Sequence, residues 1–261
     1  MIALDFGFGA LEAEFWRLLF VMTRIGAAMV AAPLFGAGSV PPQVRVIATG
    51  AIAVLVCAWS PAVQPPPALL SVEGMVVLAG EVLIGLSLGF VLQIAFAAPV
   101  LAAEVIGGSM GISMATAVDP NNGVQSPALG QYFTVVLTLI FLALDAHLHW
   151  FAIVVESYRA FPPGETWLGP ERIETIAAFA GTMFATAVAI ALPVTLILLL
   201  VQLVTGVLSR SAPSLNLFAL GLPAGVLAGI AALLLAAPLF TDRFVDLTEL
   251  AIDTSGELLV R

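Results

Sequence analysis

The chain has 261 residues, of which 61% are hydrophobic and only 10% are charged. Soluble domains carry about 45–50% apolar and about 25% charged residues, so lipid or other proteins must cover much of this chain's surface. The net charge is −9, every basic residue is arginine, and no basic stripe exists that could follow phosphates, which excludes nucleic acid as a partner. The single cysteine, Cys57, excludes an internal disulfide and a cysteine-based metal cluster.

Six apolar blocks follow one another between clusters of proline, glycine and polar residues. They cover residues 14–32, 43–59, 72–98, 132–155, 176–208 and 217–240. A membrane crossing needs about 20 apolar residues to span about 30 Å of hydrocarbon. We therefore expect an all-α, polytopic membrane protein with about six long helical segments. The third and fifth blocks exceed one simple crossing, and Pro193 predicts a kink or break in the fifth.

Two stretches depart from this pattern within the single membrane domain expected for residues 1–261. Residues 99–130 are too apolar for an ordinary solvent loop, and too rich in glycine, serine and turn residues for a stable spanning helix. Non-helical backbone at membrane depth persists only where it is buried in protein or lines a cavity. This stretch is therefore either a re-entrant loop or a short linker. Residues 241–261 alternate acidic and apolar positions, which predicts an amphipathic tail helix on a surface or partner.

Charged side chains inside the apolar blocks are expensive, since each costs a few kcal/mol near the bilayer centre. Arg24, Glu81, Glu104 and Asp145 are of this kind. They could form an ion or proton relay. They could instead pair in buried positions between subunits, or lie beside an aqueous channel.

Glycines also recur at four-residue spacing, which lets membrane helices approach closely. These sets are Gly85 with Gly89, Gly107 with Gly111, and Gly221 with Gly225 and Gly229.

The sequence has no recognisable arrangement of catalytic residues. His147 and His149 point to different sides of a helix, whereas a helical metal pair prefers positions four apart. The sequence contains no nucleophile elbow, no zinc-protease motif, no phosphate-binding loop and no dinucleotide fingerprint. We expect neither enzymatic activity nor a cofactor.

Four segments in chain order resemble the FliR family of flagellar type III export-gate proteins, which has injectisome homologues. They are Met22–Gly26 leading through Ala32–Gly36 to Val40, Pro41 and Arg45; Glu81 with Gly85 and Gly89; Gly107–Pro120; and Ser209–Phe218 with Gly221–Pro223. The third segment has the family's Gly-x-x-Met-Gly-hydrophobic-Ser-x-Ala-Thr pattern leading into Asp-Pro. Ala146 stands before His147 where the family has glycine, and Ser214 replaces the usual glutamine. The resemblance covers essentially the whole chain.

The resemblance implies a non-enzymatic core subunit of the flagellar export gate, in the bacterial inner membrane at the basal body. A FliR protein is similar to a fusion of FliP and FliQ, and it assembles with copies of both. The further partners implied are FlhB and FlhA homologues, membrane lipid and unfolded flagellar export substrates. The residues implied to plug and gate the pore are Gly107, Gly108, Met110, Gly111, Met114, Asp119, Pro120 and Gly123. Those expected at subunit contacts are Arg24, Glu81, Gly85, Gly89, Arg210, Pro213 and Phe218.

The residue types agree with a plug, because glycines permit tight turns and methionines can seal an irregular hole. A hydrophobic constriction blocks ions by dewetting. A passive packed loop is the alternative for this segment. Two alternatives remain for the whole chain: an injectisome homologue, which differs in cargo, and a small-solute or ion secondary transporter. The transporter would require paired broken helices in two related halves, and only one candidate break is found.

Overall fold

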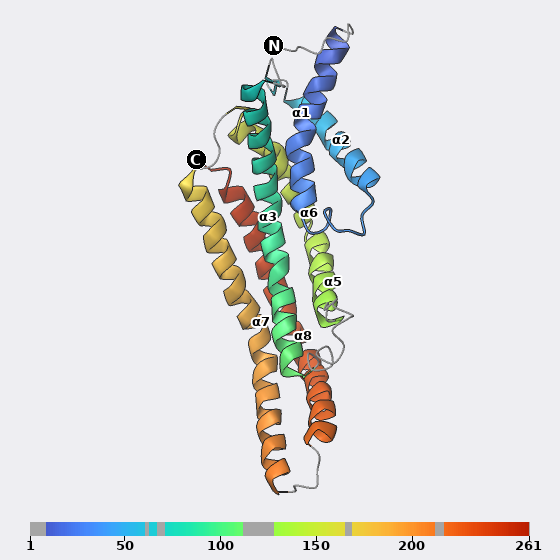
Figure 1. The fold of residues 1–261 in the computed structure, drawn as a ribbon, viewed down its shortest axis with the longest axis vertical. Helices are drawn as coiled ribbons and strands as arrows, with labels where there is room; N and C mark the ends of the chain where they lie inside the picture. Colours follow the sequence, from blue (N-terminus) through green and yellow to red (C-terminus); the bar gives the residue numbers. More distant parts are fainter. Residues whose placement is uncertain are drawn as a thin grey trace. The chain divides into compact units, whose positions relative to one another are not determined.

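The computed structural model describes residues 9–60, 63–66, 71–111, 128–164, 169–211 and 217–260, and the regular structure in these ranges is entirely helical (Figure 1). The helices are α1 (Ala10–Ala31), α2 (Pro42–Trp59), α3 (Val72–Ser109), α5 (Ala128–Ala143), α6 (Ala146–Ala160), α7 (Pro170–Ser211) and α8 (Leu217–Glu257). The predicted all-α class is confirmed.

Four of the described helices are long and apolar enough to cross a membrane, namely α2, α3, α7 and α8 from Pro223 onward. The bent pair α5 and α6 adds a fifth if it counts as one span. The first apolar block is helix α1, which also carries Glu12, Glu14, Arg17 and Arg24. The polytopic architecture is confirmed, and the predicted number of about six long apolar segments is approximate.

Proline and serine set several helix boundaries. α1 ends at Ala31, where Ala32 adopts an extended conformation ahead of Pro33, as the residue before proline commonly does. α2 and α7 both begin with proline, which loses nothing in the first turn because its missing N–H would have no helical acceptor there. Before α3, the Ser71 hydroxyl accepts a hydrogen bond of 3.0 Å from the Gly74 N–H, as an N-cap does.

The helices differ from the sequence expectations at three places. α3 continues through Pro99 to Ser109, so the predicted loop begins as helix. α7 runs through Pro193 without a break. The fourth apolar block is divided into α5 and α6, whose axes differ by 70°. Asp145 begins the second half with a left-handed backbone (φ 54°), which a regular helix cannot contain.

The described residues cluster into two compact units. The first takes the chain up to Ile94, Asp145–Phe179 and the residues from Leu250 onward, and the second takes Ala95–Leu144 and Ala180–Glu249. α3, α7 and α8 each contribute residues to both units.

The first unit has its core where α1, α3 and α6 meet. Ile25, Leu88 and Trp150 are completely buried there. The Trp150 indole N–H donates to the Leu88 carbonyl at 3.2 Å, and its ring stacks on Phe35 with centroids 6.1 Å apart. The buried tryptophan therefore has a partner for its polar atom, as such residues require.

The second unit has an aromatic core. Phe133 of α5 packs against Phe240 and Phe244 of α8, with ring centroids 5.2 and 5.6 Å apart. Phe96 of α3 meets Phe141 of α5 edge-on at 5.8 Å.

Large apolar side chains remain exposed along helix α7. Eight of them are at least half exposed between its middle and its end: Leu192, Leu196, Leu199, Leu200, Leu203, Val204, Val207 and Leu208. An exposed apolar surface of this extent on a charge-poor chain must be covered by lipid or by partner proteins.

Candidate functional site

A buried ion pair joins α1 to α3 in the first unit. Arg24 is completely buried and Glu81 is 2% exposed. The Arg24 Nε donates to one Glu81 carboxylate oxygen at 2.7 Å, and its Nη2 donates to the other at 2.8 Å. Such a two-bond arginine–carboxylate pair is among the stronger and geometrically more specific charged contacts in proteins.

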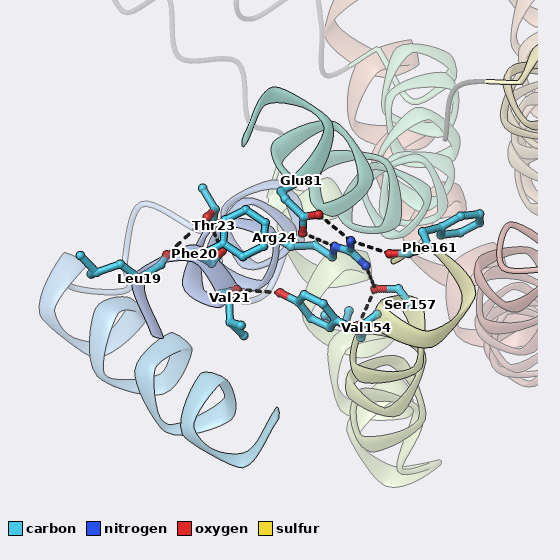
Figure 2. Close-up of polar contacts among 10 residues, drawn as sticks. Leu19, Phe20, Val21, Thr23, Arg24, Glu81, Val154, Ser157 and Phe161 are labelled. Carbon is cyan, nitrogen blue, oxygen red and sulfur yellow. Dashed lines mark hydrogen bonds and ion pairs between the residues drawn. The ribbon is translucent and has the colours of Figure 1, made fainter. Parts of the chain in front are cut away.

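The remaining guanidinium donors reach the C-terminal end of α6 (Figure 2). Nη1 donates to the Ser157 hydroxyl at 3.1 Å, and Nη2 also donates to the Phe161 carbonyl at 2.9 Å. The Tyr158 ring lies 4.1 Å from the guanidinium carbon, and its hydroxyl donates to the Val21 carbonyl at 2.7 Å. One arginine thus holds three helices together with its charge compensated, as a buried charge requires.

Glycine allows α1 and α3 to approach closely beside this pair. Gly85 and Gly89 follow Glu81 at four-residue intervals, so all three lie on one face of α3. A Cβ atom on Gly85 would lie 2.9 Å from the Ala27 Cβ, and one on Gly89 would lie 2.6 Å from the Ala31 Cβ. The ion pair and the two glycines therefore form one contact stripe along α1.

Arg24, Glu81, Gly85 and Gly89 are the residues expected at subunit contacts, and that role stays a prediction. All four make contacts within the chain, since the pair is buried and both glycines pack on α1. Sequence reasoning selected the four residues because a charge in an apolar helix and a four-residue glycine spacing both stand out. It could not decide between partners 57 residues away in the same chain and partners on another chain.

Sequence reasoning missed Arg17, which lies seven residues before Arg24 and hence on the same face of α1. Its side chain donates to the carbonyls of Cys57, Ser60 and Val63 at 2.9, 2.9 and 2.8 Å. The last carbonyls of a helix lack intrahelical donors, and a cation at this end also interacts favourably with the negative end of the helix dipole. Arg17 therefore caps the C-terminal end of α2. The seven-residue arginine spacing was the available signal.

We expect Arg17→Leu to destabilise the end of α2, because each buried carbonyl left without a donor costs about 1–3 kcal/mol. The measurement is hydrogen exchange of the backbone near Ser60, together with thermal stability of the detergent-purified chain. Arg243→Leu is the control, since the Arg243 side chain is 55% exposed and its ion pair with Asp246 is long, at 3.8 Å. Unchanged exchange in Arg17→Leu would contradict the capping role.

The predicted tail begins as the last 17 residues of α8, from Thr241 to Glu257. Phe244, Leu247, Ala251 and Leu258 are buried within the chain, whereas Leu250 is exposed. Whether the tail also contacts a partner stays a prediction. Arg172 of α7 donates to the Leu258 carbonyl at 3.2 Å and lies 4.6 Å from the centre of the Phe161 ring. These contacts hold the chain's C-terminal end in the first unit.

The predicted plug residues divide between described and undescribed parts. Gly107 and Gly108 lie in the last turn of α3, Met110 is 4% exposed, and Gly111 has a positive φ of 81°. Met114, Asp119, Pro120 and Gly123 lie outside the described residues.

The remaining expected contact residues lie around the connection between α7 and α8. Arg210 is exposed in the last turn of α7. Pro213 is outside the described residues, and Phe218 lies in the first turn of α8 with an undescribed side chain. Their role remains a prediction.

The other polar candidates lie on different elements of the described chain. Glu104 is exposed on α3, and Asp145 is exposed at the α5–α6 bend. The Nδ1 atom of His147 is buried and has no hydrogen-bond partner among the residues that the structure describes. Within the described ranges, no group of three or more His, Cys, Asp or Glu side chains could hold a metal ion.

These observations define a class: a multi-pass helical membrane protein whose polar residues hold its own helices together. Residues 15–251 match the family described as bacterial export proteins, family 1. The chain is 32% identical to flagellar biosynthetic protein FliR of Escherichia coli (strain K12), covering 95% of this chain and 94% of that protein. It is 31% identical to FliR of Bacillus subtilis (strain 168), covering 94% and 95%, respectively. The chain belongs to the FliR members of this export family.

Proposed function

We propose that this chain is a core subunit of the flagellar type III protein export gate and helps to form and close its pore. The observation that carries the proposal is the family match over residues 15–251, with FliR relatives aligned along nearly their whole length. The pore would pass unfolded flagellar proteins across the bacterial inner membrane. The chain would act without enzymatic chemistry, so the energy for export would come from partners and the proton-motive force.

The exposed apolar face of α7 supports a role inside a larger assembly. The described part of the chain does not cover this face, although α7 contains few charges to keep it in water. Homologues of FliP and FliQ are the proposed neighbours. FlhB and FlhA homologues are proposed to contact the completed gate, with the α7–α8 connection as the candidate contact for FlhB.

The stretch from Gly107 to Gly123 is proposed to close the pore. Its described start supports a fixed point of entry, because α3 ends at Ser109 and Gly111 adopts a positive φ that favours glycine. Flexible methionines and glycines suit a seal that passing chains displace.

Deleting Gly107–Gly123 is expected to let ions leak through the assembled gate, since the seal would be absent. The experiment compares proton influx into membrane vesicles that contain equal amounts of wild-type or deleted complex. The amount of complex in each sample is measured from the FliP and FliQ homologues that co-purify with the tagged chain, and the samples are matched to that amount. A deleted complex as tight as wild type would remove the closing role. Gradient-driven uptake of a small solute by the chain alone in liposomes would support a transporter instead.

A further inference from the structure

Helix α2 packs on α1 through one face, and the described residues do not cover its opposite face. Thr49, Ala53 and Val56 are the buried residues of α2. The large side chains that point outward are 45–72% exposed: Val44, Val46, Ile47, Val54, Leu55 and Trp59. An apolar face of this kind on a membrane protein must be covered by lipid or by another protein.

Side-chain size on the two faces of α2 favours lipid as the cover. Membrane helices associate closely through small residues, and α2 turns small residues toward α1. A Cβ atom on Gly50 would lie 3.9 Å from the Met22 Cε, and Ala53 is completely buried. Thr49, the polar residue in the middle of α2, also faces α1 and donates to the Met29 sulfur at 3.2 Å. The outward face holds mainly branched aliphatic side chains, which match acyl chains in polarity.

The length and the two ends of α2 suit one crossing of a bilayer. At 1.5 Å per residue, its 18 residues extend over about 27 Å, close to the hydrocarbon thickness of about 30 Å. No charged residue lies between Arg45 in the first turn and Trp59 at the end. Trp59 is 72% exposed, and tryptophan is enriched where the membrane meets water. The outward face therefore has the dimensions of the acyl-chain layer.

Arg45 carries a charge that the described chain does not neutralise. Four other arginines have a carboxylate oxygen within 4.0 Å, namely Arg17, Arg24, Arg159 and Arg243. Arg45 has no such partner among the described residues, and one of its terminal nitrogens donates to the Ala37 carbonyl. A guanidinium stays charged and binds phosphate through several N–H donors. A cation at the end of an apolar helix face matches a phospholipid, in which a phosphate stands at the end of acyl chains.

From this arrangement we propose that the outward face of α2 contacts lipid and that Arg45 binds the headgroup phosphate of an anionic phospholipid. The long arginine stem can follow the helix surface while the charge stays at headgroup level. A zwitterionic headgroup carries its own cation beside the phosphate, so Arg45 favours a headgroup with a net negative charge. The inference does not depend on the proposed pore closure, since it requires only that α2 faces the bilayer in the assembled protein.

The first test measures what covers α2 in the complex that co-purifies with FliP and FliQ homologues, placed in lipid nanodiscs. A nitroxide label is attached to Ile47→Cys or Val54→Cys in a Cys57→Ser background, since Cys57 is the only native cysteine. We expect both labels to collide often with oxygen, which dissolves in acyl chains, and rarely with a water-soluble nickel chelate. Thr49→Cys, which faces α1, is the control and is expected to be poorly accessible to both. Poor access of both reagents to Ile47→Cys and Val54→Cys would show a protein cover, and frequent nickel collisions would show water; either result overturns the lipid contact.

The second test measures the affinity of the same complex for phosphatidylglycerol and for phosphatidylcholine by native mass spectrometry. Arg45→Gln is expected to weaken the tightest phosphatidylglycerol binding about fivefold, because one arginine beside an anionic membrane surface commonly supplies that factor. Phosphatidylcholine binding is expected to change little. Arg45→Lys keeps the charge and is expected to stay close to wild type. Arg159→Gln is the control, since its side chain is 67% exposed and already paired with Glu156.

Equal phosphatidylglycerol affinity in wild type and Arg45→Gln would overturn the headgroup contact. The wild-type complex tests the same point if Arg45→Gln fails to assemble, because equal affinity for the two lipids would also overturn it. Neither result bears on the leak expected from the Gly107–Gly123 deletion, so this proposal and the closing function fail separately.

Discussion

Glu81→Leu is expected to prevent the chain from accumulating as a stable folded protein. Without the carboxylate, the Arg24 guanidinium stays buried between α1, α3 and α6. Its remaining hydrogen-bond partners among the described residues, the Ser157 hydroxyl and the Phe161 carbonyl, carry no charge. Removing one partner of a buried ion pair costs about 3–5 kcal/mol, which is a large share of the stability of an ordinary domain. The measurements are the level of full-length chain in membranes and its half-life after synthesis is stopped.

The double variant Arg24→Leu with Glu81→Leu is expected to recover most of this loss. Replacing both charges with apolar groups leaves no unpaired charge and is often close to neutral. The Phe161 carbonyl would still lose one donor, so recovery is expected to be incomplete. Arg159→Leu is the matched control, because its pair with Glu156 is exposed on both sides (67% and 55%) and such pairs contribute little. Equal levels in the control and in Glu81→Leu would contradict the role of the buried pair.

Gly89→Ala is expected to separate α1 from α3 and to destabilise the first unit by about 1–3 kcal/mol, the usual cost of adding volume to a packed contact. The new methyl group would lie 2.6 Å from the Ala31 Cβ and 2.9 Å from the Ala32 nitrogen. Ala32 N is backbone, so relief requires the helices to move apart, which also stretches the nearby Arg24–Glu81 contact. Gly85→Ala is expected to act in the same direction, with the Ala28 nitrogen 3.0 Å from the new atom.

Gly80→Ala is the control for both glycines, because it lies on the same helix and a Cβ atom there would meet nothing within 4 Å. Alanine has the higher helix propensity, so this variant is expected to be neutral or slightly more stable. The measurement is the melting temperature of the detergent-purified chain for all three variants. If the three shift alike, helix propensity rather than the close α1–α3 contact governs the result.

The fold class followed from composition and block length. An apolar fraction this high and blocks of membrane length permit few structures other than a helical membrane protein. Individual helix ends were harder to place. Pro99 and Pro193 suggested interruptions, but α3 and α7 continue through both because a helix can lose one internal hydrogen bond when neighbouring helices support it. Hydropathy did not predict the break at Asp145, because the left-handed conformation of one residue does not change how apolar the surrounding block is.

The sequence by itself determined the membrane class, the family, and which charges and glycines were unusual. Only the tertiary structure decided where those residues find their partners. Arg24 meets Glu81 and Ser157 across separations of 57 and 133 residues, and the Met110 side chain lies beside Gly229, which is 119 residues further along the chain. Periodicity identifies the face of a helix on which a residue lies. The partner of that face depends on which helices pack together, and this depends on the whole bundle.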